Sequence, residues 1–282
     1  MTSRPILVRG GTLVTDERSA RADLLVEGER IARVGPSLEA PGDAEVVDAT
    51  GRLVLPGGVD PHTHFDLEMF DTRSSDDHYT GHEAAAFGGT TTVLDFVPQL
   101  PLGTLADGIA RWREKAARAA IDFGFHANVT RLDAMVEAEI PRLLDLGIPT
   151  LKVFTAYNGR LRLSDRDIFR VLRLAARHGM LVMMHAENGD VIEVLTAEAV
   201  AAGRTEPVWH ARTRPAWGAV EATFRGAALA AQAGCPLYVV HMNVADEVEM
   251  ISLARRRGAR VMGETCPQYL FFEEGDLARP DG

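Results

Sequence analysis

The chain has 282 residues, of which 46% are hydrophobic and 25% are charged, so it has enough apolar surface to form a core and is not mainly disordered. Its 40 acidic and 30 basic side chains give a formal net charge of −10, which argues against nucleic acid or an anionic membrane as a partner. Residues 1–10 contain no apolar signal segment, no apolar run approaches about 20 residues, and two cysteines suit a reducing compartment. We therefore expect a cytoplasmic protein.

Residues 1–55 are typical of short β-strands without helices. The segment 23–34 predicts a hairpin that turns at Glu27-Gly28-Glu29, because apolar residues flank a turn sequence there. Shorter apolar segments at Ile6–Val14, Val46–Asp48 and Leu53–Leu55 add further strands. We expect a small β unit over residues 1–55 and a second domain over residues 56–282.

From Gly57 onward, strand-like apolar runs alternate with helical segments. The seven runs are Gly58–Phe65, Thr90–Phe96, Asp122–Val129, Thr150–Ala156, Leu181–Glu187, Leu237–Asn243 and Arg260–Cys266. The helical segments include Leu105–Ala119, Leu132–Leu146, Asp165–His178, Val220–Ala233 and Val244–Arg257. Such alternation predicts parallel strands joined by crossover helices. The near-continuous apolar character of the strands indicates burial on both faces.

A closed barrel and an open doubly wound sheet both fit this alternation. The chain has no glycine-rich nucleotide motif after a strand and no P-loop, which favours the barrel. A (β/α)₈ barrel needs eight strands, whereas the sequence shows seven. Either one strand is hidden in the pattern or the chain stops early.

Four histidines fall at the ends of three of these strands. His62 and His64 are two residues apart, so on a strand they share a face and can grip one metal ion. His185 ends the fifth run and His241 ends the sixth. Because the carboxyl ends of barrel strands meet at one rim, we expect all four imidazoles to lie together. Imidazole suits zinc and similar divalent ions.

Lysine is rare in this chain, since 28 of the 30 basic residues are arginine and only Lys115 and Lys152 are lysine. Lys152 lies in the fourth apolar run, where burial favours the neutral amine. A neutral amine can react with CO₂, and the resulting carbamate can bridge two metal ions, which arginine cannot do. The alternative is a lysine that extends to solvent at a strand end. Beside four histidines at the rim, the carbamate is the interpretation that we favour.

The remaining candidates have plainer interpretations. His78 and His82 lie in a polar, helical stretch and are expected in solvent, as is Lys115 on a helix face. His126 ends the third run and is a candidate for an outer contact to the site. His210 lies in a long loop, residues 205–218, which is a candidate cover for a substrate.

Several longer motifs now match a known family. They are Pro56-Gly57-Gly58-Val59-Asp60-Pro61-His62-Thr63-His64, Ala86-Phe87-Gly88-Gly89-Thr90-Thr91-Thr92, Leu151-Lys152-Val153-Phe154-Thr155-Ala156-Tyr157, His185-Ala186-Glu187-Asn188-Gly189-Asp190, Pro236-Leu237-Tyr238-Val239-Val240-His241 and Gly263-Glu264-Thr265-Cys266-Pro267-Gln268-Tyr269-Leu270. In this order they resemble the cyclic amidohydrolases, above all dihydropyrimidinase and D-hydantoinase. The motifs are spread over nearly the whole chain.

The resemblance implies an α/β fold, a (β/α)₈ barrel with seven of its eight strands present, beside a small N-terminal β-sandwich portion. It implies two divalent metal ions, usually zinc. His62 and His64 would hold one ion, His185 and His241 the other, and carbamylated Lys152 would bridge them. The ions would lower the pKa of a shared water and produce hydroxide near neutral pH.

For the reaction, the resemblance implies hydrolysis of a cyclic amide or ureide such as dihydrouracil or a hydantoin. Tyr157 matches the tyrosine that polarises the scissile carbonyl in this family. The resemblance also suggests a homotetramer.

Other members of the superfamily are weighed on single residues. Dihydroorotases resemble H-x-H-x-R here, whereas Phe65-Asp66 follows His64, so that substrate is disfavoured. An allantoinase-like hydrolase and a non-catalytic metal-binding or assembly remnant stay open as alternatives. Family members continue beyond this length with an eighth strand and its metal-binding aspartate, and we assign no residue here to that role. We therefore expect the 282-residue chain alone to be weakly active or inactive, which turnover of dihydrouracil by a chain of verified length would refute.

Overall fold

A computed structural model describes residues 4–279 of the chain, which divide into two compact units. The first unit holds residues 4–59 together with Gly89–Thr91, and the second holds residues 60–88 and 92–279. This division assigns Pro56–Val59 to the first unit. The boundary expected after residue 55 stays a prediction.

The first unit consists of two small mixed β-sheets, and residues 4–59 contain no helix. The strands are β1 (Ile6–Arg9), β2 (Thr12–Val14), β3 (Ser19–Arg21), β4 (Asp23–Glu27), β5 (Arg30–Gly35), β6 (Glu45–Asp48) and β7 (Leu53–Val54). One sheet has the order β5-β4-β1-β6 and the other β3-β2-β7. The predicted hairpin is confirmed, because β4 and β5 pair antiparallel. Leu7 and Leu25, which face each other in this sheet, are fully buried.

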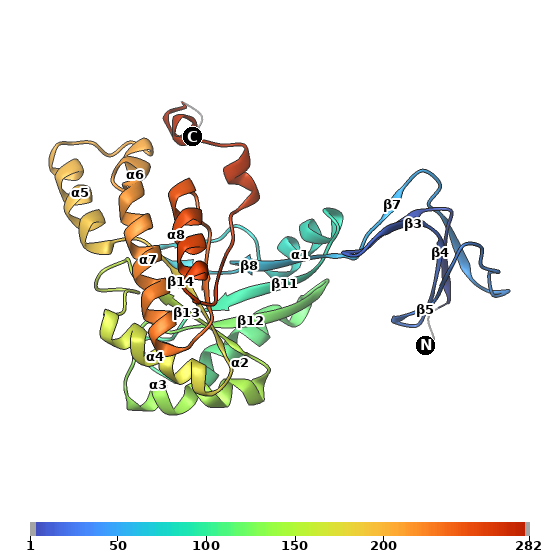
Figure 1. The fold of residues 1–282 in the computed structure, drawn as a ribbon, viewed down its shortest axis with the longest axis horizontal. Coiled ribbons are helices and arrows are strands. Elements are labelled where there is room, and N and C mark those ends of the chain that lie inside the picture. Colours follow the sequence, from blue (N-terminus) through green and yellow to red (C-terminus); the bar gives the residue numbers. More distant parts are fainter. Residues whose placement is uncertain (1–3, 280–282) are drawn as a thin grey trace. The chain divides into compact units, whose positions relative to one another are not determined.

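Within residues 4–279, the second unit contains one sheet of seven strands. They are β8 (Gly58–Thr63), β11 (Thr90–Val97), β12 (Asp122–Asn128), β13 (Thr150–Phe154), β14 (Leu181–His185), β15 (Leu237–Val239) and β16 (Val261–Gly263). Their order in the sheet is their order in the chain, so β8 and β16 form its two ends. Each pair from β11 to β16 is parallel. The seven predicted runs are thus confirmed as one curled sheet, seven strands of a barrel (Figure 1).

Helices connect these strands, most of them along the outside of the curl, whereas α6 lies at the rim of the cavity (Figure 1). They are α1 (His78–Phe87), α2 (Leu105–Lys115), α3 (Ala134–Glu139), α4 (Asp165–Arg177), α5 (Gly189–Ala201), α6 (Val208–Arg212), α7 (Ala216–Ala233) and α8 (Ala245–Arg256). Short 3₁₀ helices η1 (Ala116–Arg118), η2 (Ile140–Leu146), η3 (Pro267–Leu270) and η4 (Glu274–Ala278) and a ribbon of β9 (Glu68–Met69) and β10 (Thr72–Arg73) complete the unit. Helices α5 and α6 were not predicted, and α6 replaces part of the loop expected at residues 205–218.

The core of the second unit lies between the sheet and these helices. Helix α2 contacts β12, α4 contacts β14, α7 contacts β15 and α8 contacts β16. Leu151 and Val153 on β13 and Ile168 and Leu172 on α4 are fully buried. Apolar side chains therefore fill the layer between the sheet and the helices. Polar side chains lie instead on the concave side of the sheet, near the ends of its strands.

Of the side chains expected in solvent, His78 and His82 are buried and Lys115 is half-buried, so those predictions are wrong. His78 is 1% exposed and His82 is inaccessible, because both face inward from α1 and their rings pack against Phe65. The side chain of Lys115 is 14% exposed and its Nζ donates to the carbonyl oxygen of Asp66 over 2.6 Å. The sequence around α1 is polar, so it did not indicate which face of the helix would be buried. Only the packing of α1 against the rest of the unit defines that face.

The burial of His78 makes the stability of the fold sensitive to acid. Neither of its ring nitrogens has a hydrogen-bond partner within residues 4–279, and Asp95 Oδ2 lies 3.5 Å from Nε2. Burial lowers the pKa of His78 from 6.5 to about 4. A base whose pKa is lower in the folded state stabilises the fold above pH 6.5, and this stability is lost as the pH falls toward 4.

Between pH 7.5 and pH 5.0 we expect the free energy of unfolding to decrease in both the unsubstituted chain and His78→Leu. The decrease should be about 2 kcal/mol smaller in His78→Leu, because the variant has no imidazole to protonate at this position. Urea unfolding at the two pH values measures this difference. His178→Gln, at the exposed C-cap of α4, is the control and should follow the unsubstituted chain. An identical acid response of His78→Leu and the unsubstituted chain would show that His78 does not contribute.

Candidate active site

The predicted site residues meet at the carboxyl ends of the parallel strands. His62 lies in β8 and His64 follows it, Lys152 lies in β13, His185 ends β14 and His241 follows β15. A cavity of about 1210 Å³ opens at this rim. The residues that line it include His64, Lys152, Tyr157, His185 and His241. The folded chain therefore brings together side chains that are up to 179 positions apart in the sequence, from His62 to His241.

The rings of His62, His64 and His241 form one cluster on an aromatic floor. The centroid of the His62 ring lies 5.2 Å from that of His64 and 5.5 Å from that of His241. Below them, the ring of Phe96 lies 4.5 Å from His62 and 5.1 Å from His64. Phe96 is 1% exposed, so the histidines stand between the apolar interior and the cavity.

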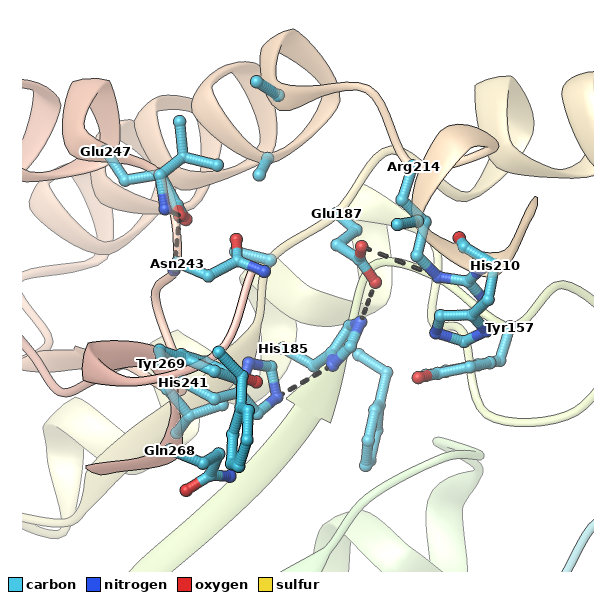
Figure 2. A pocket seen from close by; sticks show the side chains of 18 of the residues that line it. Tyr157, His185, Glu187, His210, Arg214, His241, Asn243, Glu247, Gln268 and Tyr269 are labelled. Atoms are coloured by element: carbon cyan, nitrogen blue, oxygen red, sulfur yellow. Dashed lines mark hydrogen bonds and ion pairs between the residues drawn. The ribbon is translucent and has the colours of Figure 1, made fainter. Parts of the chain in front are cut away.

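The other side of the cluster is a chain of polar contacts that starts at His241. His241 Nε2 lies 3.0 Å from His185 Nδ1, and His185 Nε2 lies 2.6 Å from Glu187 Oε2. Glu187 in turn forms an ion pair with Arg214 over 3.8 Å. Figure 2 shows these contacts in line along one wall of the cavity. Glu187 thus orients His185, since its carboxylate accepts a hydrogen bond from the protonated Nε2. The lone pair is then on Nδ1.

Burial keeps these bases neutral. Desolvation, together with the neighbouring positive groups, lowers the pKa of His64 to about 3 and that of His241 to about 2. Burial also lowers the pKa of His185, although Glu187 opposes the shift. The neutral imidazole is the form that binds a metal ion. His64, His185 and His241 are therefore in the metal-binding protonation state at neutral pH.

Lys152 is the most deeply buried amine in this arrangement, with 2% of its surface exposed. Its Nζ lies 4.7 Å from the ring centroid of Phe96 and 5.4 Å from that of Phe154. Burial lowers its pKa from 10.5 to about 7, while the charge of Glu264 opposes the shift. A large fraction of the amine is therefore neutral near pH 7, which is the form that reacts with CO₂.

Tyr157 and His241 both have backbone conformations that are unusual for their residue types. Their φ angles are 67° and 42°, in the left-handed region that glycine normally occupies. The turn at Tyr157 brings its ring within 5.0 Å of the His185 ring (Figure 2). Strain of this kind persists where the surrounding structure holds a functional side chain in place.

The donor set suits a metal, although its atoms are not gathered around one point. Among residues 4–279, no three His, Cys, Asp or Glu side chains are arranged to hold a metal ion. The 3.0 Å between His185 Nδ1 and His241 Nε2 is close to the separation of about 3.3 Å that two nitrogens have on a tetrahedral zinc, from Zn–N bonds of about 2.0–2.1 Å. Neutral imidazoles and a carbamylated lysine fit a zinc pair chemically.

Sequence reasoning missed three polar residues of this rim. Glu187 and Glu264 contact His185 and His62 directly, and both come within three positions after the end of a strand. Asn128, the last residue of β12, lines the cavity beside Lys152, and its buried Oδ1 has no hydrogen-bond partner within residues 4–279. Their position at or just after the end of a strand was the available signal, because the ends of β8, β13, β14 and β15 carry the predicted site residues. His126 contacts the carbonyl oxygen of Pro61 over 3.0 Å and so supports β8 from outside the cavity.

Comparisons with known proteins agree with this geometry. The model of the amidohydrolase family matches residues 53–269. The chain belongs to the amidohydrolase family. It is 45% identical over 277 residues to a D-hydantoinase of Geobacillus stearothermophilus, covering 98% of this chain and 59% of that protein. It is 37% identical to a dihydropyrimidinase of Arabidopsis thaliana, covering 53% of that protein.

Solved structures give the same picture. The crystal structure of a dihydropyrimidinase from Brevibacillus agri is 46% identical and has a TM-score of 0.95, over 98% of this chain and 60% of that chain. A structure of D-hydantoinase is 45% identical with a TM-score of 0.95. The resemblance to D-hydantoinases and dihydropyrimidinases and the barrel fold are thus confirmed. The chain spans about 60% of the length of the relatives it matches.

No helix between residues 4 and 279 is both long and apolar enough to cross a membrane. The cytoplasmic location expected from the sequence stays a prediction.

A close approach of two loops holds Tyr157 at the rim. The Thr155 hydroxyl contacts the carbonyl oxygens of both His185 and Glu187 over 2.8 Å, which ties the end of β13 to the end of β14. Gly189, at the start of α5, is packed against this junction. A Cβ atom at Gly189 would lie 2.8 Å from the Ala156 Cα and 3.0 Å from the Thr155 carbonyl oxygen.

We expect Gly189→Ala to lower the free energy of unfolding by about 1–3 kcal/mol, because the added methyl meets backbone that cannot move freely. Thermal or urea unfolding measures the change. The matched control is Gly218→Ala in α7, where the nearest atom to a Cβ would be the Asn188 Cβ at 3.6 Å, an ordinary contact, and alanine favours the helix by about 1 kcal/mol. Equal stability of the two variants would contradict the close packing at Gly189.

Proposed function

We propose that this chain carries the metal-binding and carbonyl-polarising residues of a hydrolase that opens a cyclic amide or ureide ring, of the hydantoin or dihydropyrimidine class. The observation that carries the proposal is the meeting of four histidines, a buried lysine and Tyr157 at one rim of the sheet. The relatives, which are named D-hydantoinase and dihydropyrimidinase, support the choice of substrate class. The homotetramer that the resemblance suggests stays a prediction.

In this proposal His62 and His64 would hold one divalent ion, His185 and His241 would hold the second, and Lys152, as a carbamate, would serve both. When bound, two zinc ions supply Lewis acidity and a source of hydroxide near neutral pH. The protein's part is to present neutral imidazoles, which burial provides. Phe96 and Phe154 exclude water from around Lys152, which keeps its amine available for CO₂.

Tyr157 is the residue that polarises the scissile carbonyl in this proposal. Burial raises the pKa of its hydroxyl, and the negative charge of Glu187 adds to the shift. The hydroxyl therefore keeps its proton at neutral pH. It can donate a hydrogen bond to the oxygen on which negative charge develops. Its turn conformation directs the ring into the cavity rather than along the strand, so the donor faces the bound substrate.

Removing the bridging amine tests the metal site. We expect the unsubstituted protein to bind two zinc ions and Lys152→Ala to lose both the pair and the activity. Lys152→Arg should behave in the same way, because a guanidinium forms no such carbamate. Metal analysis of the dialysed proteins measures the stoichiometry. Lys115→Ala removes the other lysine, which lies outside the cavity, and should keep the metal. An unchanged pair in Lys152→Ala would count against the bridging role.

We expect Tyr157→Phe to lower kcat for hydrolysis of dihydrouracil or a hydantoin by about 10²–10³-fold, with a smaller change in KM, since loss of one oxyanion donor has this cost. Steady-state kinetics measure it on the zinc-loaded protein extended to the length of its relatives, since the 282 residues alone are expected to be weakly active or inactive. Tyr79→Phe, at an exposed tyrosine of α1, is the control. Full kcat in Tyr157→Phe would remove this role.

Allantoin hydrolysis in place of these substrates would favour the allantoinase-like alternative, and metal binding without turnover would favour the non-catalytic one.

A further inference from the structure

Glu264 connects the two ends of the curled sheet. It is the first residue after β16, and its carboxylate contacts Nδ1 of His62 in β8, at the opposite end of the strand order. The two residues are 202 positions apart in the chain. Their side chains are each 12% exposed, so the contact crosses the concave side of the sheet away from bulk water.

The carboxylate is itself held in place from several sides. Tyr238 Oη donates to Glu264 Oε2 over 3.1 Å, which leaves Oε1 for His62. The backbone of Glu264 is fixed by two hydrogen bonds, from its own amide to the Val239 carbonyl oxygen over 3.0 Å and from the Met242 amide to its carbonyl oxygen over 2.8 Å. The acceptor that faces His62 therefore has little freedom to move.

This contact decides which nitrogen of His62 can bind a metal. A carboxylate accepts hydrogen bonds, so the His62 nitrogen that faces it carries the proton. In a neutral ring the proton on Nδ1 leaves the lone pair on Nε2. The ring is further confined by Phe96 and by the edge of His64, so its orientation and its tautomer are both set.

We propose that Glu264 is a positioning residue, which holds the proton on His62 Nδ1 and so presents Nε2 as the metal-binding nitrogen. The metal-binding part of this inference rests on the proposed function. A carboxylate that orients a ligating histidine in this way typically contributes about 10–100-fold to metal affinity. A purely structural role, as a tie between β8 and β16, would affect stability without setting the tautomer.

The experiment reads the tautomer on the metal-free chain. The ¹⁵N chemical shifts of histidine rings report which nitrogen carries a proton, and the His62 signals are assigned by their loss in His62→Gln. We expect Nδ1 of His62 to carry the proton in the unsubstituted chain and to lose this preference in Glu264→Leu and Glu264→Gln. An unprotonated Nδ1 in the unsubstituted chain, or an unchanged tautomer in both variants, would overturn the proposal.

Two controls separate positioning from stability. Tyr238→Phe removes the second partner of Glu264 and leaves the carboxylate facing His62, so it should keep the tautomer. Glu247→Gln changes another buried carboxyl group, which is bound to Thr223 over 2.9 Å and touches no histidine, so it should alter stability alone. A loss of the Nδ1 proton in Glu247→Gln equal to that in Glu264→Gln would overturn the specific role of Glu264.

Zinc titration of the same variants gives the second readout. We expect Glu264→Gln and Glu264→Leu to bind the first zinc ion about 10–100-fold more weakly than the unsubstituted chain, with Tyr238→Phe changed far less. Equal zinc affinity in all four proteins would overturn the positioning role. Failure of the unsubstituted chain to bind zinc at all would overturn the proposed function, while the tautomer measurement would still decide the role of Glu264.

Discussion

Parallel hydrogen bonding between consecutive strands brings the carboxyl ends of β8 and β11 to β16 to one rim of a curled sheet, and the whole candidate site depends on this alignment. Each strand contributes few residues, and no two neighbouring strands supply a complete set. Because the strands are in chain order and curl, groups at the two ends of the sheet approach one another across its concave side, as His62 and Glu264 do. A flat sheet with the same sequence would hold the same residues far apart.

The rim is built so that its bases stay neutral while its carboxylates are each committed to one histidine. Phe96 and Phe154 exclude water from around His64 and Lys152, and this burial lowers the pKa values of both groups. Glu187 accepts a hydrogen bond from His185, and Glu264 accepts one from His62. Each of these carboxylates therefore contacts one histidine of the site. The two carboxylates therefore orient the imidazoles without filling the space between them.

The sequence was sufficient for what depends on local pattern. The seven strands follow from apolar runs that alternate with helical segments, and the hairpin at Glu27-Gly28-Glu29 follows from turn chemistry; the structure has all of them. Contacts that depend on curvature were out of reach, above all Glu264 with His62. The solvated positions assigned to His78 and Lys115 were wrong, since their neighbours in sequence are polar while their neighbours in space are aromatic rings and the Asp66 carbonyl. Helix α5 was missed because its valine and alanine pattern lacks a strong apolar face.

The scarcity of lysine has a practical consequence for chemical labelling. Arginine supplies nearly all of the positive charge on the surface, and the two lysine side chains are 14% exposed or less. Amine-selective reagents, such as acylating esters, therefore find almost no ε-amino group on the folded chain within residues 4–279. Any acylation of Lys152 reports that the floor of the cavity has opened and that the amine carries no carbamate. The composition of the chain thus limits lysine acylation to two positions, Lys115 and Lys152, of which only Lys152 lies in the cavity.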